Sequence, residues 1–360
     1  MTASPRPPGA RPDSIPSSPA EITAAWLSSV MDEQFASVRV EPVGTGQTAS
    51  TYRVTAESCG STRTFIAKLP SQQQDVRERV ALGYRAEHAF YTRAADTVSV
   101  PLPSVYYCDI TTDASQFVLL MSDSAPATQG DQIRGCSEAD ALLAVEALAG
   151  LHGPRWCDPA WLSFEGVTMP KADADFARGM GELGKVALDA VLSGLGDRIG
   201  AADRETLTAS AALFEPWLIT GPDRFCLLHG DYRLDNLLFD PAESTVTVVD
   251  WQTITIGLPA RDLAYFLGTS LSPDLRATTE HSLVSAYHHR LLAHGVTDYT
   301  RADCWTDYRL GMLQIPLLTT FGYAFAATTD RGDDAMLAMI HRGCQAIRSL
   351  QTLELIKTLD

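Results

Sequence analysis

The sequence lacks any Cys-x-x-Cys pair. Its seven cysteines are scattered along 360 residues, at positions 59, 108, 136, 157, 226, 304 and 344. Structural zinc sites and disulfide frameworks both need cysteines at short, recurring spacings. The sequence therefore indicates neither kind of site, and we expect a reducing, cytoplasmic setting.

The sequence also has few apolar segments that could enter or cross a membrane. Residues 1–20 contain six prolines among serines and alanines, which predicts a disordered tail rather than an apolar signal segment. Residues 310–329 carry no charge, but Gln314, Pro316 and Gly322 dilute their apolar character. We expect a buried helix there, with a membrane-inserted segment as the alternative.

Positive charge is scarce. The chain has 28 Lys and Arg against 44 Asp and Glu, and residues 122–360 account for −14 of the formal net charge of −16. Nucleic acids bind to positive surfaces, so the composition argues against a nucleic-acid partner. An acidic C-terminal part could attract a cationic or amine-bearing small molecule. Acidic residues that only keep the surface solvated explain the charge equally well.

The most informative segment is His229-Gly-Asp-Tyr-Arg-Leu-Asp-Asn236, which is followed fourteen residues later by Asp250. The spacing His-x-Asp-x-x-x-x-Asn places the Asp231 carboxylate where it can accept a proton from a hydroxyl. Asn236 and Asp250 supply the hard oxygen ligands that Mg²⁺ prefers. The pattern predicts a phosphoryl-transfer site, with Asp231 catalytic and Asn236 and Asp250 on the metal. The alternative is a buried Asp and Asn that only cap loops.

The residues between Asn236 and Asp250 strengthen this hypothesis. Two β-type runs, 237–239 and 246–249, flank the turn-forming residues 240–244. A short hairpin would bring Asp250 back beside Asn236.

A glycine-containing turn near the N-terminus is a candidate phosphate lid. Gly44-Thr-Gly46 lies between two predicted strands, and glycine lets the backbone donate N–H groups at close range. Ala49 stands where a kinase glycine loop has its third glycine, so the motif is incomplete. A hydroxyl from Thr48 or Ser50 could assist.

Lys68 lies on a predicted strand, 63–69, on the opposite face from Phe65, Ala67 and Leu69. A helix is predicted over about 75–95, with Glu87 on its apolar stripe. An acid there is costly unless it is paired. A Lys68–Glu87 ion pair removes that cost and leaves Lys68 as the candidate ligand of nucleotide phosphates.

The buried-looking run 117–121 leads into a polar, proline-containing segment, which predicts an interlobe hinge. Backbone groups from Met121 to Asp123 could bind the adenine edge. Farther on, Ser137-Glu-Ala-Asp140 matches a capping box and predicts a helix that ends at His152. We expect His152 to be structural.

Together these motifs resemble the aminoglycoside phosphotransferase and choline kinase-like family, and most closely its ecdysteroid kinase-like branch. The likeness runs through residues 38–350. Its further motifs are Glu87-His-Ala-Phe-Tyr91, Leu119-Leu-Met-Ser-Asp123, Val249-Asp-Trp-Gln252 and Asp262-Leu-Ala-Tyr-Phe266.

The resemblance implies an α+β, bilobal, protein-kinase-like fold. It would comprise a tail (1–20), a small N-lobe with an antiparallel sheet and one helix (21–121), and a larger, mainly helical C-lobe (122–360). ATP and Mg²⁺ would be used to phosphorylate a hydroxyl of a small aminoglycoside-, choline- or sterol-like acceptor. Residues 154–225 would help to form the acceptor pocket. Neither the acceptor nor the oligomeric state follows from the sequence.

Other interpretations compete with a small-molecule kinase. A protein kinase is disfavoured because Gly230 replaces the usual arginine, Trp251-Gln252 replaces Phe-Gly, and no Ala-Pro-Glu segment follows Asp250. A nucleotide-binding pseudokinase scaffold predicts a lost catalytic group, whereas all the groups named above are present.

Three residues of the motif, together with Asp262 beyond it, have predicted supporting roles. His229 would brace the loop, Asp262 would cap a helix or brace the loop, Arg233 would be structural or approach the γ-phosphate, and Asp235 would be a surface charge.

Overall fold

The computed structural model describes residues 14–43, 49–219, 223–325 and 330–359. The chain divides into two compact units. The first comprises Met1–Thr92 and Pro103–Ser124, and the second comprises Arg93–Leu102 and Ala125–Asp360. The chain therefore passes from the first unit to the second after Ser124, having already contributed residues 93–102 to the second.

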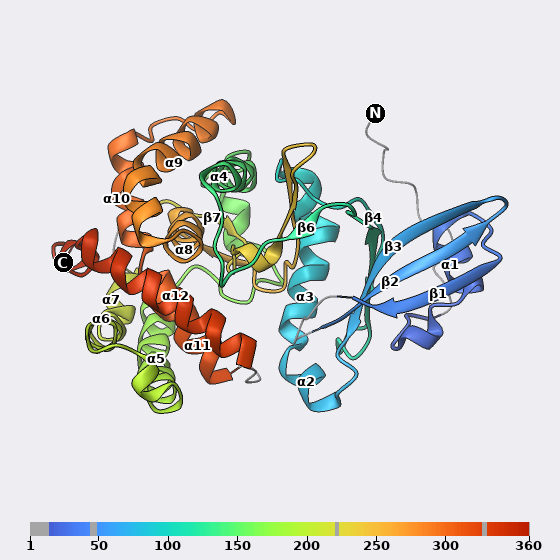
Figure 1. The fold of residues 1–360 in the computed structure, drawn as a ribbon, viewed down its shortest axis with the longest axis horizontal. Helices are drawn as coiled ribbons and strands as arrows, with labels where there is room; N and C mark the ends of the chain where they lie inside the picture. The colour runs from blue at the N-terminus through green and yellow to red at the C-terminus, as the bar shows by residue number, and fades with distance from the viewer. Residues whose placement is uncertain (1–13, 44–48, 220–222, 326–329, 360) are drawn as a thin grey trace. The chain divides into compact units, whose positions relative to one another are not determined.

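The first unit is built on a five-stranded antiparallel sheet in the order β1-β2-β3-β5-β4. Its strands are β1 (Ser37–Pro42), β2 (Ala49–Ser58), β3 (Ser61–Pro70), β4 (Val105–Ile110) and β5 (Phe117–Ser122). Figure 1 shows β1, β2 and β3 as long blue strands. The β2–β3 hairpin turns at Gly60, whose φ of +85° lies in the left-handed region that glycine favours.

The alternation predicted for β3 is present. Phe65, Ala67 and Leu69 pack into the cluster that also holds Trp26, while Ile66 packs on the cluster of the other face. Because successive side chains of a strand point to opposite faces, Lys68 shares the face of Ile66.

Three α-helices belong to this unit: α1 (Ala24–Met31), α2 (Gln74–Arg79) and α3 (Ala81–Ala89). The single helix predicted over about 75–95 is divided at Val80, where φ is −102° and ψ is 11°. After α3 the chain continues as a π-helical turn, Phe90–Ala94. Tyr84 of α3 stacks on Phe117 of β5, with ring centroids 5.5 Å apart, and this contact packs α3 on the sheet.

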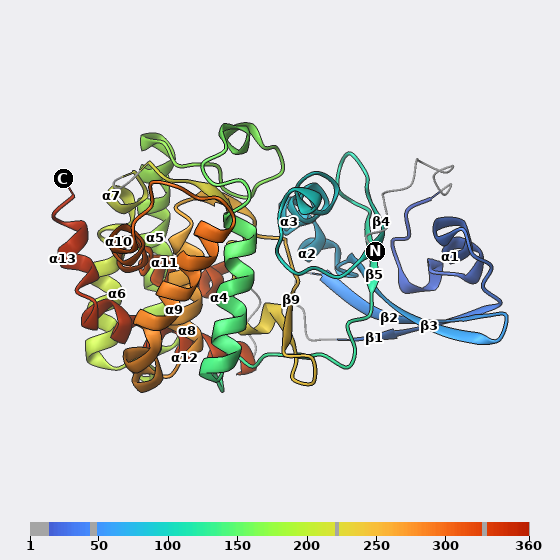
Figure 2. The same cartoon turned by 90° about the horizontal axis from the view of Figure 1, so that it is seen from above.

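The second unit is mainly helical. Its helices are α4 (Glu138–His152), α5 (Ala174–Gly194), α6 (Ala201–Ala211), α7 (Phe214–Ile219), α8 (Ala260–Ser270), α9 (Pro273–Ala293), α10 (Arg301–Gly311), α11 (Gln314–Phe325), α12 (Asp330–Ser349) and α13 (Thr352–Ile356). Every residue of α8 is buried, and it packs against α9, α10, α11 and α12. Figure 2 shows α8 surrounded by other helices of this unit. The predicted capping box is present at Ser137, at the start of α4.

Five short strands complete this unit: β6 (Thr128–Gln129), β7 (Cys226–Leu228), β8 (Leu237–Asp240), β9 (Thr245–Val248) and β10 (Thr255–Gly257). They form a β10-β7 pair and a three-stranded sheet in the order β6-β8-β9. Across the chain, 3-10 turns occur at Pro19–Glu21, Ala95–Thr97, Pro159–Ser163, Gly196–Arg198 and Leu234–Asn236. The predicted α+β class, with an antiparallel sheet followed by a mainly helical part, is confirmed.

The uncharged run from Leu310 is divided between two helices, because α10 ends at Gly311 and α11 begins at Gln314. Gln314 and Pro316 are buried inside the second unit. Within the residues that the structure describes, no helix has the length and apolarity to cross a membrane.

Candidate active site

The loop that carries the central motif leaves β7 at His229 and enters β8 after Asn236. Gly230 has a φ of +83°, and a Cβ built on it would lie 2.0 Å from the backbone oxygen of Thr253. No L side chain fits that position without moving the backbone. The glycine that distinguishes this loop from a protein-kinase loop is thus a geometric requirement of the turn.

Asp262 of α8 binds the backbone of this loop. Its carboxylate accepts hydrogen bonds from the backbone N–H groups of His229 (2.7 Å) and Gly230 (3.1 Å), and its side chain is fully buried. Asp262 was predicted either to cap a helix or to brace the loop. Pro259 is the N-cap residue of α8, so Asp262 does not cap this helix, and its contacts are those of a brace. His152, which we expect to be structural, is fully buried: its Nδ1 lies 2.7 Å from the Tyr287 hydroxyl oxygen and its Nε2 lies 3.5 Å from the Asp262 carboxylate.

Both ring nitrogens of His229 contact backbone groups. Nδ1 accepts from the backbone N–H of Asp231 (3.3 Å), and Nε2 lies 3.1 Å from the carbonyl oxygen of Val249. His229 therefore ties the loop to the segment after β9, which is the bracing role predicted for it.

The Asp231 carboxylate is held by three donors. Tyr265 donates to Oδ1 (3.0 Å), while Arg233 Nε (3.0 Å) and Asn236 Nδ2 (3.1 Å) donate to Oδ2. About a quarter of the Asp231 side chain remains exposed, at 28%. Both oxygens are therefore oriented, and the group can still be reached by a small molecule.

Two of these donors keep their protons because of their surroundings. Burial, together with the charge of Asp231, raises the pKa of Tyr265 well above its usual value, so its hydroxyl stays a donor. Burial alone would lower the pKa of Arg233, but the charges of Asp231 and Asp235 raise it overall. Arg233 is therefore a permanent cation placed between two carboxylates.

The prediction of a surface charge at Asp235 is wrong. Its side chain is buried, accepts a hydrogen bond from Arg233 (2.6 Å) and receives the backbone N–H of Gln132 (3.3 Å). Arg331 of α12 lies 3.5 Å away. Asp235 thus fastens the loop to two distant segments of the second unit.

The predicted hairpin between Asn236 and Asp250 is present. Leu237 of β8 pairs with Val248 of β9, and the backbone N–H of Val249 donates to the carbonyl oxygen of Asn236 (3.0 Å). Asp250 is the next residue, and its φ of +68° turns the chain out of the strand direction. The hairpin therefore closes the fourteen-residue gap and brings the backbones of the two residues together.

The donor set of this pair fits Mg²⁺. The Asn236 amide nitrogen faces Asp231, which leaves the amide oxygen as the atom suited to a cation, and Asp250 adds a carboxylate. In the described parts of the chain, no three His, Cys, Asp or Glu side chains gather as a metal-binding group. Mg²⁺ needs no such cage, because one or two protein oxygens suffice when waters and substrate phosphates complete its shell.

The first unit contains the predicted Lys68–Glu87 pair. Lys68 Nζ lies 2.9 and 2.8 Å from the two carboxylate oxygens, and the residues are 7% and 1% exposed. The pair joins β3 to α3. It fixes the Lys68 ammonium group on the strand through contacts with both oxygens of the Glu87 carboxylate.

The remaining predicted residues lie at several places. Ser50 pairs with Leu69 at the start of β2, and Met121 is buried in β5. The Asp123 carboxylate forms an ion pair with Arg53 at 2.7 Å. Gly44, Gly46 and Thr48 lie outside the residues that the structure describes.

Tyr265 is the functional candidate that sequence reasoning missed. It lies three residues after Asp262 on α8, so both side chains project from neighbouring positions of one helix face. Asp262 holds the loop backbone and Tyr265 holds the loop carboxylate. Tyr265 could have been found from the sequence, because it lies three residues after Asp262 in a helical segment that was expected to brace the loop.

The sequence profile described as "Phosphotransferase enzyme family" matches residues 39–305. The chain belongs to this family. The family resemblance is thereby confirmed, while the ecdysteroid kinase-like branch stays a prediction.

Curated relatives match parts of this phosphotransferase. The acyl-CoA dehydrogenase family member 11 of Gallus gallus is 31% identical over 179 residues, which cover 46% of this chain and 20% of that protein. The acyl-CoA dehydrogenase family member 10 of Mus musculus is 41% identical over 69 residues, covering 18% of this chain and 6% of that protein. The matched segments thus span no more than a fifth of these relatives' length.

Solved structures share the fold of the phosphotransferase at low identity. A microcompartment-associated aminopropanol kinase gives a TM-score of 0.55 at 20% identity, covering 88% of this chain and 94% of that one. A choline kinase from Cryptosporidium parvum Iowa II gives 0.56 at 10%, covering 89% and 93%. The GDP complex of aminoglycoside 2'-phosphotransferase-IIIa gives 0.50 at 15%, covering 86% and 93%.

Proposed function

We propose that this protein is an ATP-dependent small-molecule kinase that transfers the γ-phosphoryl group of ATP to a hydroxyl of a small acceptor. The observation that carries the proposal is the Asp231 carboxylate, which is oriented by three donors beside Asn236 and the strand pair that leads to Asp250. Family membership supports the reaction class.

The residues of the site divide the work of this reaction between nucleotide binding, metal binding and proton transfer. Lys68 binds the phosphates of the nucleotide, and Glu87 orients Lys68. Asn236 and Asp250 would hold Mg²⁺, which would neutralise charge on the phosphate oxygens. The acceptor oxygen forms the new bond to phosphorus while the bond to the leaving ADP oxygen breaks. Asp231 orients the acceptor hydroxyl and takes its proton, late in a loose transition state.

A hydroxyl on a small amine is the acceptor class that we place first. The related structures are named as kinases of aminopropanol and choline and as an aminoglycoside phosphotransferase. Most of the chain's negative charge lies within residues 122–360, which favours the approach of a cation.

The direct experiment is ATP turnover with Mg²⁺ against a panel of amino alcohols, aminoglycosides, sugars and sterols. Acceptor-dependent ADP release, with a phosphate ester formed, is the expected result. Tight ATP binding with no turnover on the whole panel would instead indicate a nucleotide-binding scaffold.

Tyr265→Phe is expected to lower kcat by about tenfold and to change KM for the acceptor by less than about threefold. The change removes one hydrogen bond to the Asp231 carboxylate, worth about 1.5 kcal/mol for a charged partner. Tyr265 is a positioning residue, so the split between kcat and KM is the measurement that matters. An equal rise in KM would point to direct contact with the acceptor.

Glu87→Gln is expected to lower the free energy of unfolding by about 3 kcal/mol, because it removes the Glu87 charge that faces the buried Lys68 ammonium. The double variant Lys68→Met with Glu87→Leu removes both charges and should regain most of that loss. Urea denaturation of the two proteins measures both values. If turnover returned along with stability in the double variant, Lys68 would have no role on the phosphates.

A further inference from the structure

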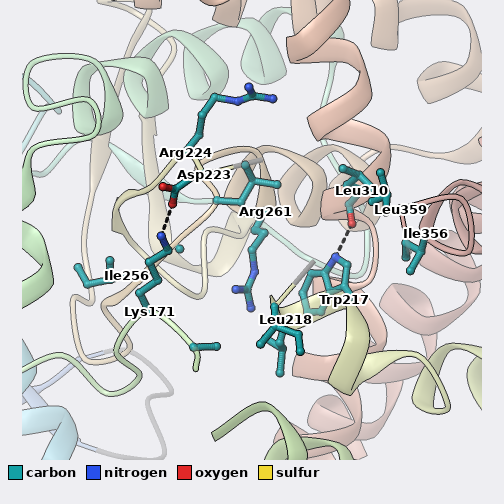
Figure 3. Close-up of a pocket in the computed structure, with 14 residues that line it drawn as sticks. Lys171, Trp217, Leu218, Asp223, Arg224, Ile256, Arg261, Leu310, Ile356 and Leu359 are labelled. Carbon is teal, nitrogen blue, oxygen red and sulfur yellow. Dashed lines mark hydrogen bonds and ion pairs between the residues drawn. The ribbon is translucent and has the colours of Figure 1, made fainter. Parts of the chain in front are cut away.

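A cavity of about 300 Å³ lies in the second unit. Its wall combines four charged side chains with apolar ones that include Trp217 and Leu218 of α7, Ile256 of β10 and Ile356 of α13. Figure 3 shows the Arg261 side chain extending into the middle of this pocket, between Lys171 and Leu218. A volume of this size is at the lower limit of small-molecule sites.

The pocket and the catalytic loop lie at opposite ends of one strand pair. β7 pairs with β10 so that Leu228 lies opposite Thr255, and Cys226 lies opposite Gly257. The catalytic loop leaves β7 after Leu228, whereas Gly257 lines the pocket. The pocket is thus separate from Asp231.

Two of the three cations that line the pocket are neutralised within the protein. Arg224 forms two hydrogen bonds with Asp307, at 2.8 and 2.7 Å. Lys171 forms an ion pair with Asp223 (Figure 3). Arg224 and Lys171 are therefore already paired with carboxylates and do not need an anionic ligand.

Arg261 differs from them. It is 8% exposed, its Nε donates to Gln314 (2.8 Å), and its guanidinium lies over the Trp217 ring at 4.4 Å. Its Nη2 is buried and has no hydrogen-bond partner, and none of the carboxylates in the described segments forms an ion pair with it. A buried donor without a partner costs free energy, so a hydrogen-bond acceptor beside Nη2 would be stabilising.

The surroundings orient this cation without neutralising it. Gln314 and Trp217 hold the Nε edge and one face, so that the Nη end remains for a ligand. A Cβ at position 257 would lie 3.0 Å from Nη1, so Gly257 leaves that end room. Burial lowers the pKa of Arg261 to about 10, which still keeps it protonated at neutral pH.

We propose that this pocket binds a small organic anion, with a carboxylate or phosphate group on the Nη end of Arg261 and an apolar body against Trp217 and Ile256. A guanidinium end matches the paired oxygens of both head groups. The apolar side chains in the wall predict that a bare inorganic anion binds less tightly than one that carries a hydrocarbon chain. The site lies outside the proposed phosphoryl-transfer machinery.

The test is calorimetric titration of the full chain with octanoate and octyl phosphate, beside octanol, octylamine and inorganic phosphate. We expect at least one of the two amphipathic anions to bind with a Kd below about 1 mM and at least tenfold more tightly than octanol. The tighter of the two identifies the head group. Equal binding of octanol, or no binding of either anion, would overturn the proposal.

Variants separate a ligand site from a structural role. Arg261→Met and Arg261→Gln should each weaken anion binding at least tenfold, while Lys185→Met, the control at an exposed lysine of α5 outside the pocket, should change it less than twofold. Without ligand, Arg261→Met should melt close to the wild type, because removing a buried charge that has no countercharge offsets the lost contacts with Gln314 and Trp217. Marked loss of stability in both Arg261 variants, or unchanged anion binding in either, would assign Arg261 to structure alone.

Discussion

Asp231→Asn is expected to lower kcat by about 10³-fold while the affinity for ATP changes by less than about twofold. Asparagine keeps the size of the side chain and one accepting oxygen, but it cannot take the proton of the acceptor hydroxyl. General-base catalysis contributes roughly 10²- to 10⁴-fold in enzymes. Steady-state kinetics on the best acceptor and calorimetric titration with ATP measure the two quantities separately.

The control for this experiment is Asp189→Asn, which removes an exposed carboxylate of α5 in the same unit. It should leave kcat within about twofold. If Asp231→Asn kept more than about a tenth of the wild-type kcat, Asp231 would not be the base. If both variants lost activity equally, a general effect of charge on the second unit would explain the loss.

Gly230→Ala is expected to lower the free energy of unfolding by about 3 kcal/mol and to abolish turnover. Two costs add at this position. A φ of +83° disfavours any residue with a Cβ, and that Cβ would lie 2.0 Å from the Thr253 oxygen. The obstacle is backbone, so rotation of a side chain cannot relieve it. The loop must shift and lose the contacts that Asp262 makes with it. Urea denaturation and kinetics check the two effects.

Gly295→Ala separates the two costs. Gly295 has a φ of +92°, but a Cβ there meets nothing within 4 Å. Only the backbone penalty remains, so we expect a loss of about 1 kcal/mol and nearly normal turnover. Equal losses of stability in the two alanine variants would show that the contact with Thr253 does not constrain the loop.

Local signals made much of the fold predictable. The β3 alternation, the capping box of α4 and the turn between β8 and β9 each depend on residues close together in the sequence. The pairing of Lys68 with Glu87 was predictable for a different reason. An acid on an apolar helix stripe requires a partner, and the strand before it offered a lysine on the matching face.

The missed features depend on contacts between distant segments. Asp235 is buried because Gln132 and Arg331, which are about one hundred residues away on either side, fold onto it. Tyr265 contacts Asp231 only because α8 packs against the loop. The break at Val80 has no glycine or proline to signal it. In each case the deciding neighbour is set by tertiary packing, which periodicity does not encode.

The β8–β9 hairpin also bears on how related chains are compared. Asn236 and Asp250 are aligned by ladder hydrogen bonds, and the exposed turn between the strands takes no part in that alignment. We therefore expect that a turn of another length would leave the relative position of Asn236 and Asp250 unchanged. A motif written with a fixed gap would overlook homologues whose turn is longer or shorter. A search that instead requires two short β-runs before the second acid would recover them.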